Sequence, residues 1–375
     1  MPVLAAILGC GVLALVLVDA FNTIVLARRT RHMFRIARAF YTITWDPFAA
    51  IGRRIRSPRA REGFLSIYGP LSLLLLFALW TAGLVAAFGL LQWALDMKPA
   101  TLEDTLGNDF YLSATTLFTL GTGDPKSSIS KLIAAFEGGI GLGFLGLVVG
   151  YLPVLYQSFS QRELRISMLD ARAGSPPSAG ALLQFCPDSP DRLEHQLMLW
   201  EEWTTQLLEA QVSFPMLAYF RSQHANQSWL TALVAVMDWA AVVSLCSRGN
   251  LKRQADLTFA IGRHALSDVV VIFGLEKPLN RGAERSGVDH AKLAEILAAN
   301  ASLFDANLFS GTKLAKLRKL YEPQAIVLGN YFLMSLPAWI PDSSSLENWK
   351  VDLMEKDDVP FAVSDPFSRS SDAPK

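Results

Sequence analysis

The chain has 375 residues, with 34 basic and 34 acidic side chains and no formal net charge. This balance excludes a basic nucleic-acid-binding protein and a strongly acidic protein as descriptions of the whole chain. The three cysteines, Cys10, Cys186 and Cys246, contain no CxxC pair, so we expect neither a disulfide nor a cysteine metal site.

Three long apolar runs lie within the first 161 residues. Residues 1–27 form the first, which Asp19 and Asn22 interrupt, and the runs of residues 63–95 and 138–161 contain no charge. At 1.5 Å per residue, each run can cross a hydrocarbon core of about 30 Å. Arginines rather than a cleavage site follow the first run, so we expect it to remain as an anchor. The sequence therefore predicts three transmembrane helices.

The charges between the runs predict the orientation of the chain. In the segment of residues 28–62, Asp46 and Glu62 face a large excess of arginines, which belongs on the cytoplasmic side of a membrane. These arginines are Arg28, Arg29, Arg31, Arg35, Arg38, Arg53, Arg54, Arg56, Arg59 and Arg61. The next connection carries Lys98 against Glu103, Asp104 and Asp109 and fits the outside. We expect a multi-pass protein of the cell (inner) membrane, with its N-terminus outside and its C-terminal part in the cytoplasm.

The basic segment permits two interpretations. Arg31, Arg35 and Arg38 recur at helical spacing beside Phe34 and Phe40, as on an interfacial helix that lies on anionic lipid. The simpler interpretation, which we favour, is a topology signal whose side chains reach the lipid headgroups. A voltage sensor is excluded, because the arginines lie in a connection and not within an apolar span.

The stretch from Tyr111 to Pro125, YLSATTLFTLGTGDP, is too short to span a membrane and too apolar for an ordinary external loop. We expect a short helix over residues 108–118 and then extended, glycine-rich backbone, which is tolerated at membrane depth only where it lines a wet cavity. Stacked carbonyl oxygens there can replace the water shell of an ion, and glycines permit the dihedral angles that this requires. The predicted filter consists of Thr119, Leu120, Gly121, Thr122, Gly123 and Asp124.

Here the chain resembles the potassium-channel superfamily. Residues 119–124 are similar to the family filter Thr-Val-Gly-Tyr-Gly-Asp, and residues 113–116 to the helix before it, within a pore module of residues 63–161. The resemblance implies a homotetramer, because each chain carries one filter strand, and no cofactor, with K⁺ ions permeating through the filter. It also assigns four residues to the pore helix, namely Ser113, Thr115, Thr116 and Phe118.

The chain departs from the family at three places. Thr122 replaces the tyrosine whose ring braces the filter, and Tyr111 and Leu112 stand where the family often has paired tryptophans. Phe118 replaces a threonine and could refill part of the missing ring volume. We favour potassium selectivity, and a weakly selective monovalent cation pore is the alternative.

The third run supplies the predicted inner helix. The resemblance places the gating hinge at Gly143, with Pro153 as a second kink site, although glycines here serve close helix packing equally well. The same alignment points four side chains at the pore, where an apolar ring could gate by dewetting, namely Phe144, Leu147, Tyr151 and Leu155. The alternative is that several of them face lipid or a neighbouring helix.

Two carboxylates lie in apolar surroundings. Glu137, near the filter, is a functional candidate by its position, and a structural hydrogen bond behind the filter is the competing interpretation. Asp19, near the inner end of the first run, is expected to reach the interface or to pair with an arginine of the next segment.

The C-terminal part has a different pattern. We expect a linker over residues 162–190, a helical cytosolic domain over 191–340 and a disordered tail over 341–375. Asp238, in the middle of an apolar stretch that is barely long enough to span, indicates a buried core helix instead. The histidines show no ligand spacing, so no metal site is predicted, and no catalytic constellation supports an enzyme.

The sequence thus predicts an all-α membrane protein with three transmembrane helices, a re-entrant pore helix with its filter, and a helical cytosolic domain. Its predicted function is passive, gated conduction of monovalent cations, with the lipid bilayer and three further copies of the chain as partners and no nucleic acid. The cytosolic domain is expected to bind an unidentified gating ligand or to hold the tetramer together. A membrane-anchored scaffold with a vestigial pore loop is the alternative from another class.

Overall fold

In a computed structural model of the chain, residues 2–26, 36–96, 102–121, 125, 127–187, 189–223, 226–277, 285 and 287–340 are described. All regular elements within these ranges are helical, which confirms the predicted all-α class. The elements are α1 (Pro2–Ala20), η1 (Phe21–Val25), α2 (Ile36–Arg54), α3 (Pro58–Asp96), α4 (Leu102–Leu117), α5 (Ser128–Ala173), α6 (Ala179–Gln184), α7 (Pro190–Ser213), η2 (Pro215–Tyr219), α8 (Trp229–Cys246), α9 (Gly249–Phe273), α10 (His290–Ala299), η4 (Ala306–Leu308), α11 (Gly311–Arg318) and α12 (Glu322–Phe332).

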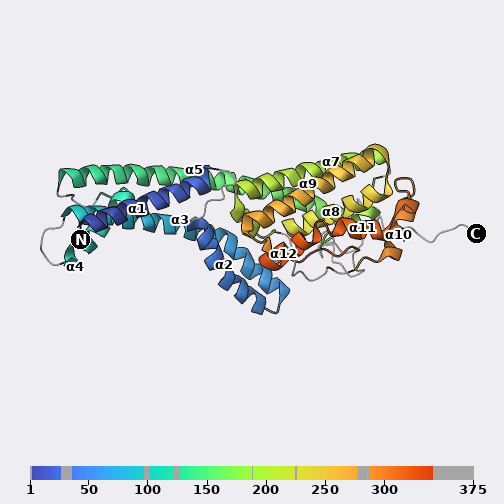
Figure 1. Cartoon of the computed structure of the whole chain (residues 1–375), viewed down its shortest axis with the longest axis horizontal. Helices are drawn as coiled ribbons and strands as arrows, with labels where there is room; N and C mark the ends of the chain where they lie inside the picture. Colours follow the sequence, from blue (N-terminus) through green and yellow to red (C-terminus); the bar gives the residue numbers. More distant parts are fainter. Residues whose placement is uncertain are drawn as a thin grey trace, which may run out of the picture.

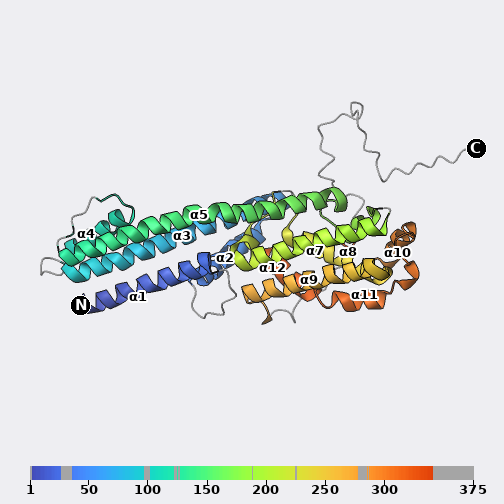
Figure 2. The same ribbon diagram turned by 90° about the horizontal axis from the view of Figure 1, so that it is seen from above.

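The molecule is elongated and has two parts (Figures 1 and 2). Helices α1, α3, α4 and α5 lie together at one end and are called the N-terminal bundle. Helices α6 to α12 lie at the other end and are called the C-terminal domain. The long helix α5 belongs to both, because it runs from the bundle into the domain.

Small residues bring α1 and α3 into close contact. A Cβ on Gly9 would lie 2.9 Å from the carbonyl oxygen of Ala87, and one on Gly83 would lie 2.7 Å from the side chain of Val16. Such close approach of two apolar helices is the usual packing mode in membranes, where van der Waals contact drives association. The glycines therefore seat the N-terminal helix on the outer side of α3.

Among the described residues, four helices are long and apolar enough to cross a membrane, which is compatible with a membrane-embedded protein. Three of them, Pro2–Val25, Pro58–Leu95 and Ser128–Asp170, belong to the N-terminal bundle. The fourth is α8, and other helices of the same chain bury 94% of it. The prediction that Asp238 marks a buried core helix is thus confirmed.

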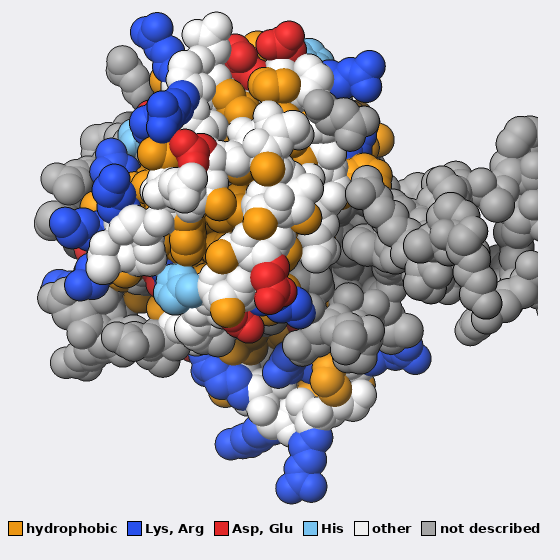
Figure 3. Space-filling model, turned by 90° about the vertical axis from the view of Figure 1, so that its right-hand side faces the viewer, with side chains coloured by type: hydrophobic (Ala, Val, Ile, Leu, Met, Phe, Trp, Pro, Cys, Tyr) orange, Lys and Arg blue, Asp and Glu red, His pale blue; other side chains and the backbone are white. Residues whose placement is uncertain are grey.

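The core of the C-terminal domain forms around α8. All its side chains from Trp229 to Ser244 are buried, and α7, α9, α11 and α12 pack against it. An apolar stripe of α7 is buried in the same core and consists of Leu193, Leu197, Trp200, Trp203, Leu207 and Leu208. Seen end-on in Figure 3, the domain presents basic and acidic side chains scattered among apolar ones, as expected of a surface in water.

A buried ion pair lies at the centre of this core. The guanidinium of Arg285 donates to both carboxylate oxygens of Asp238, at 2.9 and 2.5 Å, and the Tyr321 hydroxyl donates to the same carboxylate. Burial raises the pKa of Tyr321 well above its ordinary value, so this hydroxyl keeps its proton and remains a donor. The fully buried Asp238 is therefore tolerated because partners surround it.

Two segment predictions are wrong. Residues 162–173 of the predicted linker continue α5, and α6 buries Leu182 and Leu183 in the core of the C-terminal domain. Gly174 and the two prolines after it mark only the short junction between α5 and α6. Apolar side chains on either side of this junction, such as Leu169, pack in the core, so the flanking residues remain helical. The basic segment of residues 28–62 likewise contains α2, which packs on α3 and on the C-terminal domain. Residues 27–35 and the predicted tail of residues 341–375 lie outside the described residues.

Candidate functional site

Helix α4, which covers most of the predicted pore helix, is held between α3 and α5. A Cβ on Gly89 of α3 would lie 2.9 Å from the ring of Phe110, and a Cβ on Gly141 of α5 would overlap the carbonyl oxygen of Leu117. Because both positions are glycines and carry no side chain, α4 packs closely against α3 and α5. Its C-terminal end, from which the predicted filter continues, is thereby positioned by direct backbone contact.

A buried hydrogen-bond network joins the same three helices. The hydroxyl of Ser113 on α4 lies 3.0 Å from the carbonyl oxygen of Val85 on α3 and also hydrogen-bonds the carboxyl group of Glu137 on α5. Both Ser113 and Glu137 are fully buried. A second bond, from Gln92 Nε2 to the Ser130 carbonyl oxygen at 3.2 Å, ties α3 to α5 directly. Of the two interpretations of Glu137, the structure shows the hydrogen bond, which Glu137 makes with Ser113.

The backbone changes conformation where α4 ends. Thr119 and Gly121 have φ angles of +59° and +64°, and the amide groups of Leu120 and Gly121 donate to the Thr115 carbonyl oxygen at 2.8 and 3.3 Å. Left-handed backbone at alternate positions reorients successive carbonyl groups, and only glycine adopts it without strain. The side chains of Phe118 and Leu120 are 60% and 67% exposed. Thr122, Gly123 and Asp124 lie outside the described residues.

The other pore-helix residues have local roles. The Thr115 hydroxyl is buried and lies 3.0 Å from the carbonyl oxygens of both Tyr111 and Leu112, while Thr116 is half-buried. Phe118 is largely exposed, so the described part of the chain covers little of its ring.

The structure corrects two of the four predicted pore-lining residues. A side chain that lines a pore between subunits must be exposed on a single subunit, and Leu155 is fully buried while Tyr151 is 6% exposed. Tyr151 donates to the Met216 sulfur at 3.3 Å and packs on the rings of Phe77 and Phe214. These two side chains pack α5 against the rest of the chain. The resemblance to the potassium-channel family could not show whether they pack in this way or line a pore.

The remaining inner-helix residues lie on an accessible side of α5. Phe144 and Leu147 are half-buried, and Gly143 and Pro153 are exposed. The helix is continuous through both hinge candidates, from Ser128 to Ala173. A Cβ on Gly143 would meet no atom within 4 Å, so within the chain this glycine serves no close packing, in contrast to Gly141.

The segment that connects the two parts was not apparent from the sequence. Residues 214–223, called the connecting segment, contain η2 and contribute to both apolar cores. Met216, Leu217 and Phe220 pack into the N-terminal bundle, while Ala218 and Tyr219 pack into the C-terminal domain. The apolar run from Phe214 to Phe220 could have indicated a buried segment, although nothing in it predicted that its side chains divide between two cores.

Arg162 fastens the connecting segment to α5. Its guanidinium donates to the carbonyl oxygens of Leu217 and Phe220, at 2.8 and 2.9 Å, and to the carboxylate of Glu163. Glu163 in turn accepts a hydrogen bond from Ser222, and both members of the pair are buried. Arg162, the first charged residue after the third apolar run, therefore fastens α5 to the segment that joins the N-terminal bundle and the C-terminal domain.

An aromatic cluster makes the second connection. Trp45 of α2 packs edge-on against Tyr68 of α3 and Tyr219 of the connecting segment, and its indole donates to the Tyr331 carbonyl oxygen at 3.0 Å. Arg221 lies 3.5 Å from Glu62 and donates to backbone carbonyl groups at the end of α12. Helix α2 and the start of α3 are thus attached to the C-terminal domain rather than free on a lipid surface.

Asp19, near the end of α1, makes two hydrogen bonds that the sequence did not predict. Its carboxylate accepts hydrogen bonds from the Ala37 amide group at 3.0 Å and from the Trp80 indole at 2.9 Å. The predicted interface contact or arginine pair is replaced, among the described residues, by these two donors. Asp19 therefore ties α1 to both α2 and α3.

Comparisons of the chain with protein-family models, with curated proteins and with solved structures find no match.

Proposed function

We propose that four copies of this chain form a membrane channel that conducts monovalent cations passively, with potassium as the favoured ion. The observation that carries the proposal is the placement of α4. This helix is clamped between α3 and α5 and delivers Thr119 to Gly121, in reoriented backbone, to an exposed tip. A rigid helix that presents carbonyl groups at a fixed place is what an ion-dehydrating filter requires.

The exposed side chains support assembly. Phe118 and Leu120 are apolar and largely exposed on the single chain, next to backbone that needs a wet cavity at membrane depth. One chain supplies one strand of carbonyl groups, and four strands around an axis would surround an ion. In such a tetramer the permeating ions occupy the filter, and neighbouring subunits cover the two exposed side chains.

The contacts of α5 support gating from the cytoplasm. The helix passes without interruption from the filter region into the C-terminal domain, and the buried Arg162 attaches it to the connecting segment. A rearrangement of that domain would move the inner end of α5 directly. We therefore assign gating to this junction and to the exposed Gly143 above it.

Weak ion selectivity is the second candidate. The described part of the chain covers little of the Phe118 ring, and Thr122 offers a small side chain where the related filter has a ring. A filter with less support would discriminate less between potassium and sodium. The same experiment separates the two candidates.

The test is cation flux from liposomes that contain the purified full-length chain, with potassium or sodium gradients. We expect potassium flux that Gly121→Ala abolishes, because a side chain at φ +64° is strained. The matched control is Gly11→Ala, where a Cβ meets no atom within 4 Å and the backbone is ordinary helix. Equal potassium and sodium flux would establish weak selectivity.

Equal flux in the wild type and in Gly121→Ala, or no flux at all from a confirmed tetramer, would contradict the proposal. The scaffold interpretation predicts that result, because a vestigial pore segment tolerates any substitution. The size of the assembled particle gives an independent check, since only a fourfold assembly closes this filter.

A further inference from the structure

Glu137 of α5 is a buried carboxyl group without a cation beside it. The residue is fully buried, and Ser113 is its hydrogen-bond partner among the described residues. Its second oxygen, Oε2, is buried and has no hydrogen-bond partner there. None of the ion pairs between described residues includes Glu137. An ionised carboxylate in these surroundings would lack most of the interactions that a buried charge requires.

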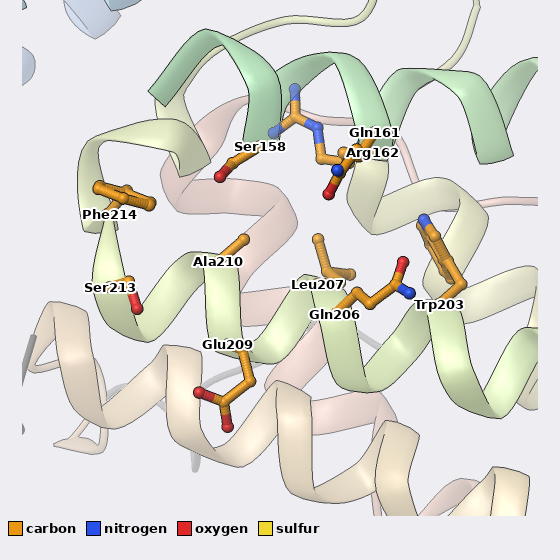
Figure 4. Close-up of a pocket in the computed structure, with 10 residues that line it drawn as sticks. All are labelled: Ser158, Gln161, Arg162, Trp203, Gln206, Leu207, Glu209, Ala210, Ser213 and Phe214. Carbon is orange, nitrogen blue, oxygen red and sulfur yellow. The ribbon is translucent and has the colours of Figure 1, made fainter. Parts of the chain in front are cut away.

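Two other buried carboxylates of the chain have a cation as partner. Asp238 accepts hydrogen bonds from the guanidinium of Arg285, at 2.9 and 2.5 Å. Glu163 lies 3.0 Å from Arg162, whose side chain leaves α5 in Figure 4. Glu137 differs from both, because its partner is a neutral hydroxyl group that can accept a hydrogen bond as well as donate one.

The Ser113 hydroxyl has one proton and two neighbouring oxygen atoms. Its Oγ lies 3.0 Å from the Val85 carbonyl oxygen, which can only accept, and it also hydrogen-bonds Oε1 of Glu137. If the hydroxyl donates to Val85, the bond to Glu137 requires a proton from the carboxyl group. If it donates to Glu137 instead, Oγ and the carbonyl oxygen face each other at 3.0 Å with no proton between them.

We propose that Glu137 is a neutral carboxylic acid that donates its proton to Ser113, and that the resulting chain of hydrogen bonds from α5 through α4 to α3 positions the start of the filter. Glu137 is thus a positioning residue. Its protonation and its effect on α4 do not depend on whether the chain conducts ions. Only the effect on ion flux rests on the proposed channel function.

The contacts of α4 explain how the chain of hydrogen bonds reaches the filter. Glycines of α3 and α5 allow α4 to approach closely, but apolar contact is non-directional and controls its rotation only weakly. Hydrogen bonds are directional, so the bonds of Ser113 fix that rotation. Two residues further on, the Thr115 carbonyl oxygen accepts from the amide groups of Leu120 and Gly121, at 2.8 and 3.3 Å. Rotation of α4 would therefore displace the acceptor that orients the first filter residues.

Infrared spectroscopy of the full-length chain in nanodiscs, at neutral pH, tests the protonation state. Carboxylic acids and carboxylates absorb at well-separated frequencies. The difference spectrum between the wild type and Glu137→Gln should therefore contain the C=O band of one carboxylic acid. The matched control is Asp256→Asn, which removes an exposed carboxylate paired with Lys252 and should remove carboxylate bands only. Carboxylate bands in the Glu137→Gln difference spectrum would overturn the proposal.

Hydrogen exchange at the amide groups of Leu120 and Gly121 tests the positioning role. Glu137→Gln keeps a hydrogen-bond donor in the same place, so both amides should exchange as in the wild type. Glu137→Leu removes the donor and should speed their exchange about fivefold, because one neutral hydrogen bond is lost. Exchange at the wild-type rate in Glu137→Leu, or equally fast exchange in both variants, would contradict the positioning role.

Ser113→Ala provides a second variant that introduces no bulky apolar side chain. It removes the middle member of the hydrogen-bond chain and should speed exchange of the same two amides to the same extent. Because both substitutions interrupt one chain, their combination with Glu137→Leu should add little to either effect. Fully additive effects would show that Glu137 and Ser113 act separately and would overturn the proposed chain.

Potassium flux from liposomes tests the consequence for the channel. Glu137→Gln should retain the flux of the wild type, and Glu137→Leu should reduce it. Equal flux in the wild type and in Glu137→Leu would reject the effect on the filter. A chain that conducts no ions would reject the proposed function alone, because the infrared and exchange measurements decide the protonation of Glu137 and the positioning of α4.

Discussion

The N-terminal bundle and the C-terminal domain both contain long apolar helices, but their own chain covers these helices to very different extents. Within the chain, 17% of the apolar window of α5 and 28% of that of α1 are buried, against 94% of that of α8. Helix α8 is covered almost completely by its own chain, whereas the described part of the chain leaves most of the apolar surface of α1 and α5 uncovered. Hydrophobicity alone therefore says that a helix must leave water, and the surrounding helices decide what covers it.

The two parts also place their buried carboxylates differently. Asp238 in the C-terminal domain meets a guanidinium and a hydroxyl group, while Glu137 in the bundle meets only the Ser113 hydroxyl among the described residues. The domain thus resembles the core of a water-soluble protein with a neutralised ion pair. Because the two parts have separate cores, we expect substitutions in the core of one part to leave the other part folded.

The largest effect is expected from Asp238→Ala. It leaves the buried Arg285 without its carboxylate, and breaking such a pair destabilises by about 3–5 kcal/mol. We expect the C-terminal domain to unfold at much lower denaturant concentration, measured by tryptophan fluorescence, while the assembled bundle persists on size-exclusion chromatography.

The control for this prediction is Lys252→Ala. Lys252 and Asp256 form an exposed pair at 3.0 Å, with both side chains about half exposed, so its loss should change the free energy of unfolding by about 1 kcal/mol or less. Loss of the assembly in Asp238→Ala would contradict this prediction, because it would show that the bundle depends on the C-terminal domain for its stability.

The reverse test is Gly141→Ala in the bundle. The new Cβ overlaps the Leu117 carbonyl oxygen, so α4 must shift, at a cost of about 1–3 kcal/mol for overpacking. We expect a lower melting temperature of the assembly and reduced potassium flux, with unchanged unfolding of the C-terminal domain. Gly146→Ala, on the same helix with no atom within 4 Å of its Cβ, should behave as the wild type.

The smallest effect concerns pH. Burial raises the pKa of the half-buried Cys186 thiol to about 12, against 9.0 as its ordinary value. The folded domain keeps this thiol protonated, whereas the unfolded chain loses the proton above about pH 9. Because the unfolded state alone releases the proton there, the free energy of unfolding should fall as pH rises above about 9.

The measurement is iodoacetamide labelling in a variant whose Cys10 and Cys246 are replaced by alanine. At pH 8 we expect labelling of Cys186 to be slow in the folded protein and fast after the domain unfolds. Cys186→Ser should weaken the loss of stability at high pH. If Cys186 in the folded domain were labelled at the rate of a free thiol, its thiol would not be buried and the prediction would be wrong.

Much of the architecture could be predicted from local pattern. The three long apolar runs appear as α1, α3 and α5, and Asp238 correctly indicated a buried core helix. These predictions succeed because hydrophobic period and length act within one helix. Tyr151 and Leu155 were misplaced because the face of a helix that meets its own chain depends on the connecting segment, some 60 residues away.

By itself, the sequence determined the helical class, the apolar helices, the short helix before the Thr-Leu-Gly-Thr-Gly-Asp motif and the separate helical C-terminal part. Each follows from residues that are close together in the chain, where periodicity, glycine and charge act locally. Only the tertiary structure decided that Gly141 seats α4 while Gly143 remains open, and that Arg162 holds the connecting segment. Such contacts bring together residues far apart in sequence, and their packing is set by the shape of both partners.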